Sequence, residues 1–373
     1  MALRALGSSG PVKPVELYLQ TAYYLFLFGD AGAAAHLLQM GKAEHGANPQ
    51  VLLNLAVCQS RSRQFAQATE TGQAFLAIEP DNAVVHDVLS RSLHELGRHA
   101  EAAATGTRAL ELKDAQCGAV AGDWRLPQGT PQEWLAARGK HDVIAFSLWG
   151  AAPRYLRGAI DNALAAPQVY PGWKLRFHVD DSVPAEVRNA LVELGCEIRD
   201  EPSGQPARDR LAWRFKVSDD PGVGRFLVRD ADSVLNPREA AAVAQWVASG
   251  RWFHVMRDWW THTDPMLAGM WGGVAGALPA LEPMLAVYNP QSMETPNIDQ
   301  WFLREEVWRY VRLNCVVHDR CFTPAGSQPW PVPAPPGGVH VGQDEFAARR
   351  QAQEQRLGRW LESLPSLRLP SRP

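Results

Sequence analysis

Small and apolar residues recur at a fixed interval along the first 115 residues of the chain. Small side chains occupy equivalent positions in three successive segments of 34 residues. Because two small residues twelve positions apart let two antiparallel helices cross closely, the pattern predicts three helix–turn–helix units. We expect the turns at 28–30, 62–64 and 96–98. The small positions are Ala22, Ala56 and Ser90 in one column and Ala34, Ala68 and Ala102 in the other.

The 34-residue period, the two small columns and Pro80 at the end of a helix resemble the tetratricopeptide repeat. The resemblance implies an α-solenoid over residues 15–114, preceded by a leader at 1–14. The aromatic residue usual at the fourth position is Tyr18 in the first unit and is missing from the other two. In such solenoids a concave groove binds a peptide or a partner protein. A supporting role or a homodimer contact is the alternative use of the repeats.

The pattern changes after a polar linker that contains Gly and Pro at residues 115–140. Short apolar runs then alternate with segments of helical periodicity, which is typical of a mostly parallel sheet covered by helices. We therefore expect an α/β domain at 141–323. A proline-rich segment and a charged helix follow it at 324–373. The expected strands are 141–148, 174–179, 224–228 and 252–256, and the expected helices are 153–165, 184–194 and 237–248.

Acidic residues follow three of the expected strands. Asp180 and Asp181 follow the second strand, Asp230 and Asp232 the third, and Asp258 the fourth. Because ligands of parallel sheets bind beyond the carboxyl ends of the strands, we expect the chemistry at this edge. Asp230 and Asp232 can both turn toward one hard cation, Mn²⁺ or Mg²⁺, that is shared with nucleotide phosphates. A loop or a helix cap is the alternative use of such a pair.

Several motifs follow one another in the expected α/β domain, namely FLVRDADS at 226–233, FHVMRD at 253–258, His262, LAGMWGG at 267–273, Asp299-Gln300 and His318-Asp319. Together they resemble bacterial proteins of glycosyltransferase type with a GT-A-like nucleotide-diphospho-sugar fold. The resemblance covers about 142–322 and implies a nucleotide-diphospho-sugar as the donor. It also implies that Asp230 and Asp232, with His318 as a further ligand, hold the divalent cation against the donor diphosphate.

Five further residues are candidates for substrate binding, and each also has an ordinary structural interpretation. Arg229 and Arg257 can neutralise the diphosphate, or they can form salt bridges to neighbouring aspartates. Arg214 can lie near the nucleotide, or it can be a surface arginine between two aromatic residues that pack in the core. Trp271 is expected beside the sugar-nucleotide site, and packing in the core is the ordinary use of a tryptophan. Gly272 can let the backbone approach the sugar closely or form a simple turn.

Three residues are candidates for catalysis. Asp299 can act as a general base toward an acceptor hydroxyl, or it can be the N-cap of a helix at 300–310. Asp258 follows the fourth expected strand, and His262 lies in a loop that is rich in tryptophan. Both are therefore placed by the sequence near the expected edge.

The composition argues against binding to nucleic acid or to an anionic membrane and against a membrane span. Lys and Arg number 37 against 40 Asp and Glu, and the net charge of −3 gives no reason to bind nucleic acid or an anionic membrane. The five cysteines form no CxxC pair, which suits a reducing compartment. No apolar run is long enough to span a bilayer, so we expect a cytoplasmic protein. All 14 tryptophans lie from Trp124 onward, which agrees with a division into two parts.

These patterns together predict an α-solenoid followed by a GT-A-like α/β domain. They predict a metal-dependent glycosyltransferase of the EC 2.4 class, whose acceptor can be a peptide or protein bound by the repeats. One alternative is a non-catalytic adaptor with a degenerate transferase domain, and another is a nucleotidyltransferase on a similar sheet. The P-loop, GxSxG and HExxH motifs are absent from the sequence, which disfavours the chemistries that depend on them.

Overall fold

The computed structural model describes residues 13–138, 141–290 and 297–369. Most of the expected leader at 1–14 lies outside the described residues. Among the helices that are described, none is both long and apolar enough to cross a membrane.

The chain divides into two compact units. The helical unit comprises the chain up to Gln116 together with two short segments, Trp260–Asp264 and Cys321–Ala325. The sheet unit comprises the remainder, from Cys117 onward. Each unit has its own buried core, and each is described separately below.

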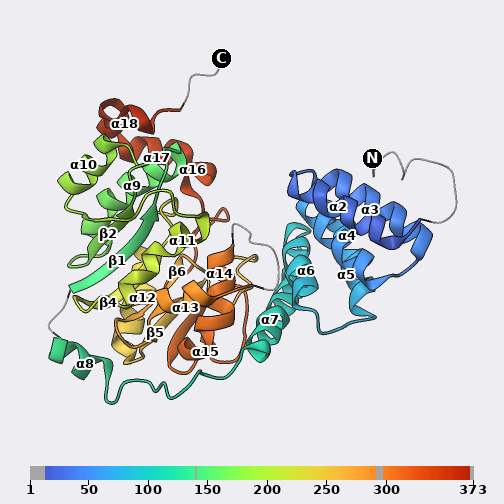
Figure 1. Cartoon of the computed structure of the whole chain (residues 1–373), viewed down its shortest axis with the longest axis horizontal. Helices are drawn as coiled ribbons and strands as arrows, with labels where there is room; N and C mark the ends of the chain where they lie inside the picture. Colours follow the sequence, from blue (N-terminus) through green and yellow to red (C-terminus); the bar gives the residue numbers. More distant parts are fainter. Residues whose placement is uncertain (1–12, 139–140, 291–296, 370–373) are drawn as a thin grey trace. The chain divides into compact units, whose positions relative to one another are not determined.

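Six helices form the repeats of the helical unit (Figure 1). The first helices of the three pairs begin at residues 15, 49 and 83, and the second helices begin at 31, 65 and 99. Each repeat is therefore 34 residues long, as the sequence predicts. The helices are α2 (Val15–Leu27), α3 (Ala31–His45), α4 (Pro49–Arg61), α5 (Phe65–Leu76), α6 (Ala83–Glu95) and α7 (His99–Gln116).

The small residues that define the repeats lie at buried positions, and asparagines cap equivalent helices. Five of the six small residues have no exposed surface, and Ala22 keeps only 2%. Asn48 and Asn82 occupy equivalent N-caps, where their side chains accept hydrogen bonds from the amides of Val51 and Val85. Close helix crossings and repeated caps therefore explain why the period is kept.

The turn of the middle repeat departs from its neighbours. Arg63 has a φ of 63°, whereas Gly29 and Gly97 at the equivalent turns have 85° and 76°. A residue with a Cβ is strained in this left-handed region, and glycine is not. Within the described residues, Arg63 is the one non-glycine residue with a positive φ.

The two short segments pack on α6 and α7 within the helical unit. Lys113 is buried and its Nζ donates to Asp87 Oδ2 at 2.7 Å and to the Thr263 carbonyl at 2.9 Å. Asp264 lies 3.2 Å from the same Nζ. Burial raises the pKa of Asp87 to about 6, and the Lys113 charge opposes that rise. A buried lysine with two carboxylates thus fixes the first segment on the repeats.

The sheet unit is built on an eight-stranded sheet within the described residues, in the order β3-β2-β1-β4-β6-β5-β7-β8. β6 runs antiparallel to both of its neighbours, β4 and β5, and the other pairs are parallel. The prediction of a mostly parallel α/β sheet is confirmed. The strands are β1 (His141–Leu148), β2 (Lys174–Val179), β3 (Glu197–Asp200), β4 (Val223–Arg229), β5 (Phe253–Arg257), β6 (Met270–Val274), β7 (Cys315–Asp319) and β8 (Ser327–Gln328).

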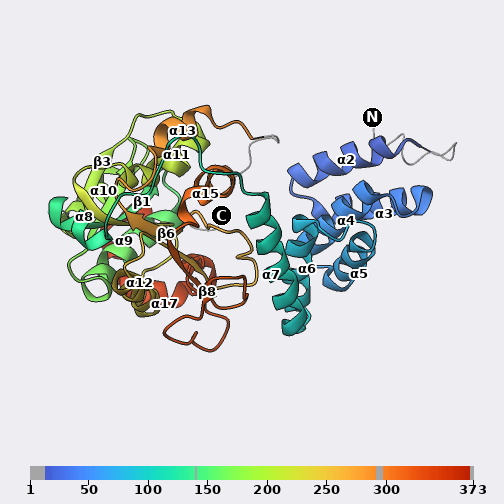
Figure 2. The same ribbon diagram turned by 90° about the horizontal axis from the view of Figure 1, so that it is seen from below.

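Helices cover both faces of the sheet (Figure 2). Strand β1 alternates between two cores: Val143 packs on the side of the first group of helices, and Ile144 and Phe146 pack on the side of the second. The first group holds α11 (Ala207–Ala212), the 3₁₀ helix Trp213–Ser218, α13 (Leu281–Val287), α14 (Ile298–Phe302), the π-helical turn Leu303–Val307 and α15 (Trp308–Val311). The second group holds α9 (Pro153–Val169), α10 (Ala185–Glu193) and α12 (Pro237–Ser249). The linker before β1 contains α8 (Pro131–Arg138).

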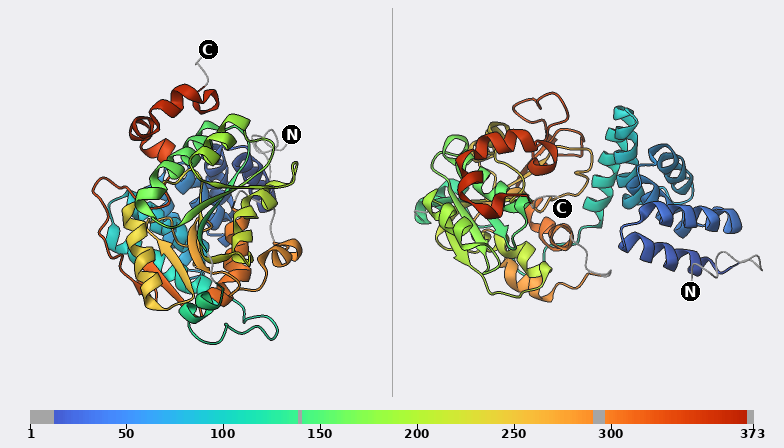
Figure 3. Two further views of the ribbon diagram at one scale, coloured as in Figure 1. Left: turned by 90° about the vertical axis from the view of Figure 1, so that its left-hand side faces the viewer. Right: turned by 90° about the horizontal axis from the view of Figure 1, so that it is seen from above.

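The C-terminal segment packs against α9 as three short helices rather than as the single charged helix that we expected (Figure 3). Arg356 pairs with Asp161 of α9 at 2.7 Å, and Arg157 Nε donates to the Leu367 carbonyl at 2.6 Å. Trp360 joins the buried core on this face. The helices are α16 (Glu345–Ala348), α17 (Arg350–Leu357) and α18 (Arg359–Ser363), followed by a 3₁₀ turn at Pro365–Leu367.

We predict that Arg63→Gly stabilises the helical unit by about 0.5–1 kcal/mol, because glycine removes the left-handed strain at this turn. Urea unfolding followed by circular dichroism measures the change. Gly97→Arg at the equivalent turn is the matched control and should destabilise by a similar amount. A lower urea midpoint for Arg63→Gly would contradict the assignment of strain.

Candidate functional site at the carboxyl end of β4

The candidate site lies where β4 ends, and a second element reaches it from β1. β1 and β4 are parallel neighbours, with Ala145 opposite Val228. Helix α9, which follows β1, therefore begins at the same edge of the sheet as Asp230, the residue after β4. The sequence predicted this edge from the strand-end aspartates, but it did not assign any residue of α9 to the site.

Two arginines hold the two aspartates that follow β4. Arg154 of α9 donates through Nε to Asp232 Oδ2 at 2.7 Å, and its Nη2 contacts the same oxygen. Arg154 also lies 3.2 Å from Asp344 Oδ2. Arg214 contacts Asp230 through Nη1 and donates through Nη2 to Asp299 Oδ2 at 2.9 Å.

The cluster carries more negative than positive charge. Its four carboxylates, from Asp230, Asp232, Asp299 and Asp344, face two guanidinium groups. Burial and the neighbouring charge of Asp230 raise the pKa of Asp232 to about 6. Burial also raises the pKa of Asp299. In both cases burial disfavours the ionised carboxylate, and the nearby guanidinium group opposes the rise in pKa.

One face of α9 shapes the loop that carries the aspartates. Arg154, Gly158 and Asn162 follow one another at intervals of four residues, so they share this face. A Cβ at position 158 would overlap the carbonyl oxygen of Ala231, between the two aspartates. Glycine therefore permits the helix and the loop to approach as closely as they do.

Asn162 fixes the same loop through hydrogen bonds of both its side-chain nitrogen and its side-chain oxygen. The side chain is fully buried. Its Nδ2 donates to the Ser233 carbonyl at 2.9 Å, and its Oδ1 accepts from the Leu235 amide at 2.9 Å. The loop's position is thus set by α9, whose residues lie about 70 positions earlier in the sequence. The four-residue spacing was the sequence signal that could have revealed this face.

The carboxylate oxygens at this edge suit a hard cation in chemistry and charge, but few of them can bind the same cation. All of them are carboxylate oxygens, and they outnumber the two guanidinium groups. Among the described residues, no group of three or more His, Cys, Asp or Glu side chains is arranged to hold a metal ion. Mg²⁺ is commonly held by one or two carboxylates, with substrate phosphates and water completing its coordination. Asp230 and Asp232 fit that arrangement, provided that a cation takes the place of the Arg154 guanidinium.

His318 lies on β7, which β6 and β5 separate from β4, and its side chain contacts other residues than Asp230 and Asp232, so its position differs from the ligand set implied by the resemblance. Its Nδ1 lies 2.7 Å from His254 Nε2, and its Nε2 lies 3.0 Å from both Gln245 and Gln328. Both histidines have no exposed surface. Burial lowers the pKa of His318 to about 4 and that of His254 well below its usual value. These are neutral core histidines of β5 and β7.

Asp258 and Arg257 are enclosed in buried ion pairs instead of facing a ligand. Asp258 has no exposed surface, contacts Arg238, and accepts from the Val341 amide at 2.7 Å. Arg257 donates to Asp319 at 2.6 Å. The salt-bridge interpretation therefore describes both residues, and a direct contact with substrate is closed to them.

Arg229 is likewise buried, and its guanidinium faces the second core. It donates to the Val228 carbonyl at 2.8 Å and lies 3.5 Å from Glu239 of α12. Of the three candidate arginines, Arg214 contacts the aspartate cluster, whereas Arg229 pairs with Glu239 and Arg257 with Asp319.

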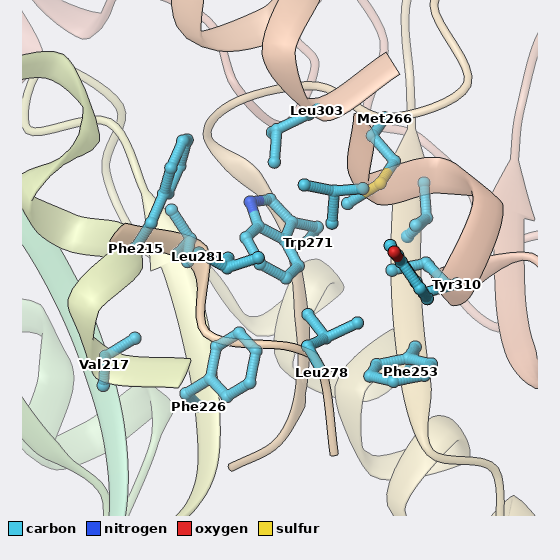
Figure 4. Packing of buried hydrophobic residues seen from close by; sticks show 14 of the residues in the cluster. Phe215, Val217, Phe226, Phe253, Met266, Trp271, Leu278, Leu281, Leu303 and Tyr310 are labelled. Atoms are coloured by element: carbon cyan, nitrogen blue, oxygen red, sulfur yellow. The ribbon is translucent and has the colours of Figure 1, made fainter. Parts of the chain in front are cut away.

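Trp271 and Gly272 lie in a central strand and not in a glycine-rich loop, which corrects their expected role. Strand β6 passes between β4 and β5, and Trp271 is fully buried among Phe215, Met266 and Leu303 (Figure 4). A Cβ on Gly272 would overlap the Phe226 carbonyl of β4. The glycine serves strand packing, and the tryptophan serves the core.

Asp299 and His262 occupy different environments. Asp299 lies in the first turn of α14, whose N-cap is Asn297, and it accepts from the Gln300 amide at 2.9 Å. Asn297 occupies the N-cap position without a capping hydrogen bond from its side chain, and Asp299 joins the cluster through Arg214. His262 belongs to the segment Trp260–Asp264 of the helical unit.

The comparisons with known proteins concern the helical repeats. No family model matches the sequence, and no curated protein matches it. Among solved structures, the chain is similar to MamA MSR-1 C2, with 22% identity and a TM-score of 0.28 over 31% of this chain and 64% of that chain. It is similar to the Arabidopsis OM64 TPR domain, with 22% identity and a TM-score of 0.27 over 28% of this chain and 87% of that one.

A third similar structure is the Yersinia enterocolitica type III secretion chaperone SycD in complex with a peptide of the translocator YopD. Its identity is 17% and its TM-score 0.26, over 28% of this chain and 80% of that chain. The chain spans less than two thirds of the MamA MSR-1 C2 chain, whereas it spans most of the other two. The repeat assignment rests on the 34-residue spacing of the helices, because these TM-scores are low.

We predict that Gly158→Ala destabilises the sheet unit by about 1–3 kcal/mol, because the added methyl group would collide with the backbone between the two aspartates. Thermal unfolding of the full chain measures the change. Gly32→Ala is the matched control, since a Cβ on this helical glycine would meet only Asp30 Oδ1, at an ordinary contact distance of 3.7 Å. It should gain about 0.5–1 kcal/mol. Equal behaviour of the two variants would show that α9 and the loop do not constrain one another.

We predict that acid destabilises the sheet unit through His254 and His318. Both have pKa values below the unfolded value of 6.5, so the unfolded chain binds more protons and stability falls as pH drops from about 6.5 toward 4. His318→Gln can keep hydrogen bonds yet cannot titrate, and it should flatten this part of the pH–stability profile. An unchanged pH slope in the variant would contradict the neutral histidine pair.

Proposed function

We propose that the sheet unit is a GT-A-like glycosyltransferase that moves a sugar from a nucleotide-diphospho-sugar to an acceptor. The observation that carries the proposal is the excess of carboxylates at the end of β4, beside the first turn of α9. An anionic diphosphate can bind at such an edge only if a cation balances it. The proposal therefore includes a divalent cation, Mn²⁺ or Mg²⁺.

Asp230 and Asp232 are the residues proposed to hold this cation. When bound, it would supply charge stabilisation to the departing nucleoside diphosphate. The Arg154 side chain is 44% exposed, so its guanidinium can swing into solvent, and the cation would then replace it as the counter-charge of buried Asp232. Arg154 would then be free to meet a donor phosphate in solvent.

Two further residues have proposed roles at the same edge. Arg214 is buried and bridges Asp230 and Asp299, so it fixes the orientation of Asp230. Asp299 is the proposed general base toward an acceptor hydroxyl, because its raised pKa makes it a stronger base than an ordinary carboxylate.

The repeats are proposed to bind a peptide or protein acceptor. Support comes from an apolar patch on the first repeat, formed by Tyr23, Tyr24, Leu27 and Phe28, of which Phe28 is 87% exposed. Such patches mark protein-binding surfaces. The SycD chaperone is in complex with a peptide of YopD, and the proposal gives this chain the same kind of partner. A homodimer contact through the same patch is the competing arrangement.

A non-catalytic adaptor is the second candidate function. The observation that favours it is the pairing of both aspartates with arginine, which satisfies them without any ligand. A nucleotidyltransferase is a third candidate on the same kind of sheet. It would release pyrophosphate, whereas a glycosyltransferase would release a nucleoside diphosphate.

We predict that one nucleoside diphosphate raises the melting temperature in the presence of Mn²⁺ and that Asp232→Asn abolishes the shift. A thermal-shift panel of nucleoside diphosphates and nucleotide sugars, with and without Mn²⁺, measures it. The shift should grow as pH rises through about 6, where Asp232 loses its proton.

Asp181→Asn is the matched control for that experiment, because Asp181 is an exposed aspartate that follows β2, which β1 separates from β4. It should leave the Mn²⁺-dependent shift unchanged. No shift with any nucleotide, together with capture of a partner by the helical repeats, would favour the adaptor.

A further inference from the structure

A cavity lies next to the segment that follows Asp232, beside the loop that carries the aspartates. Its volume is about 470 Å³, within the range of small-molecule sites. One wall is the segment that joins Asp232 to α12, a second is the proline-rich segment 332–341, and a third is formed by α16, α17 and their junction. We call it the rear pocket, and its apolar lining includes Val234, Leu235, Val332, Pro333, Pro335 and Val339.

The proline-rich wall of the rear pocket is held in place although it has no regular secondary structure. Arg238 Nε donates to the Val332 carbonyl at 2.9 Å, and its guanidinium lies over the Trp330 ring at 4.0 Å. At the other end, the Val341 amide donates to the buried Asp258 at 2.7 Å. The wall is thereby fixed at both ends, so the cavity is preformed and binding requires little ordering.

The three arginines that line the rear pocket differ in how closely carboxylates pair with them. Arg238 is engaged by Asp258, and Arg356 is engaged by Asp161 and by Glu345 at 2.8 Å. Arg349 lies 3.9 Å from the same Glu345 oxygen, too far for a good hydrogen bond, and its side chain is 46% exposed. Arg349 therefore has donors available for an anionic group at the pocket.

We propose that the rear pocket binds a small molecule with an apolar body and one acidic group, which contacts Arg349. The valine, leucine and proline walls would cover the apolar body, and the guanidinium would meet the acid by a charge-assisted hydrogen bond. A medium-chain carboxylic acid has this chemistry. The inference does not depend on the proposed transferase activity, because none of the residues that carry it belongs to the aspartate cluster.

Calorimetric titration of the full chain with octanoate, and with 1-octanol as the uncharged analogue, tests the proposal. We expect octanoate to bind roughly tenfold more tightly than 1-octanol, and Arg349→Gln to remove that difference. Arg350→Gln is the matched control, since Arg350 is equally exposed and also pairs with a residue four positions away. It should leave octanoate binding unchanged.

Val339→Trp tests the apolar body separately, because an indole on the proline-rich wall would fill the cavity. It should abolish binding of both ligands while the melting temperature stays close to that of the unmodified chain. The proposal is overturned by absence of octanoate binding at millimolar concentration, by equal binding of the two ligands, by equal effects at Arg349 and Arg350, or by full binding in a folded Val339→Trp variant.

Discussion

The close approach of α9 to the loop after β4 is the constraint on which the candidate site depends. Gly158 lets the helix backbone meet the Ala231 carbonyl, and buried Asn162 holds the loop at Ser233 and Leu235. Because both residues share a face with Arg154, the same helix that positions the aspartates also supplies the counter-charge of Asp232. Backbone packing and electrostatics are thus set together at one edge of the sheet.

The charge imbalance of this cluster gives the edge its chemical character. Burial, and after it the neighbouring charge of Asp230, raises the pKa of Asp232, so protons and cations compete for the same oxygens. By contrast, Arg257, Asp258 and Arg229 are enclosed in ion pairs whose two partners are both buried. The pair of Arg154 with Asp232 differs from these buried pairs because the Arg154 side chain is exposed. An exposed arginine can be exchanged for a ligand, whereas a buried arginine cannot.

The sequence predicted those features that depend on local periodicity. The 34-residue repeat appears because every repeat needs the same small residues at its helix crossings, and Asp230 was located because it directly follows an apolar strand. The residues of α9 were missed because they meet the loop across about 70 positions of sequence. Strand β6 is missing from the expected strands because its paired glycines, Gly272 and Gly273, are typical of a turn, although tight strand packing is what requires at least Gly272. The metal-ligand role of His318 was implied by the resemblance alone, and in the fold the His318 side chain is buried in the core.

The most direct test of the account is the number of Mn²⁺ ions bound per chain in the presence of nucleoside diphosphates, measured by electron paramagnetic resonance. The carboxylate excess at the end of β4 predicts one tightly bound Mn²⁺ in the unmodified chain and none in Asp230→Asn. A chain that binds no Mn²⁺ with any nucleoside diphosphate, or that binds it equally well after this substitution, would contradict the account.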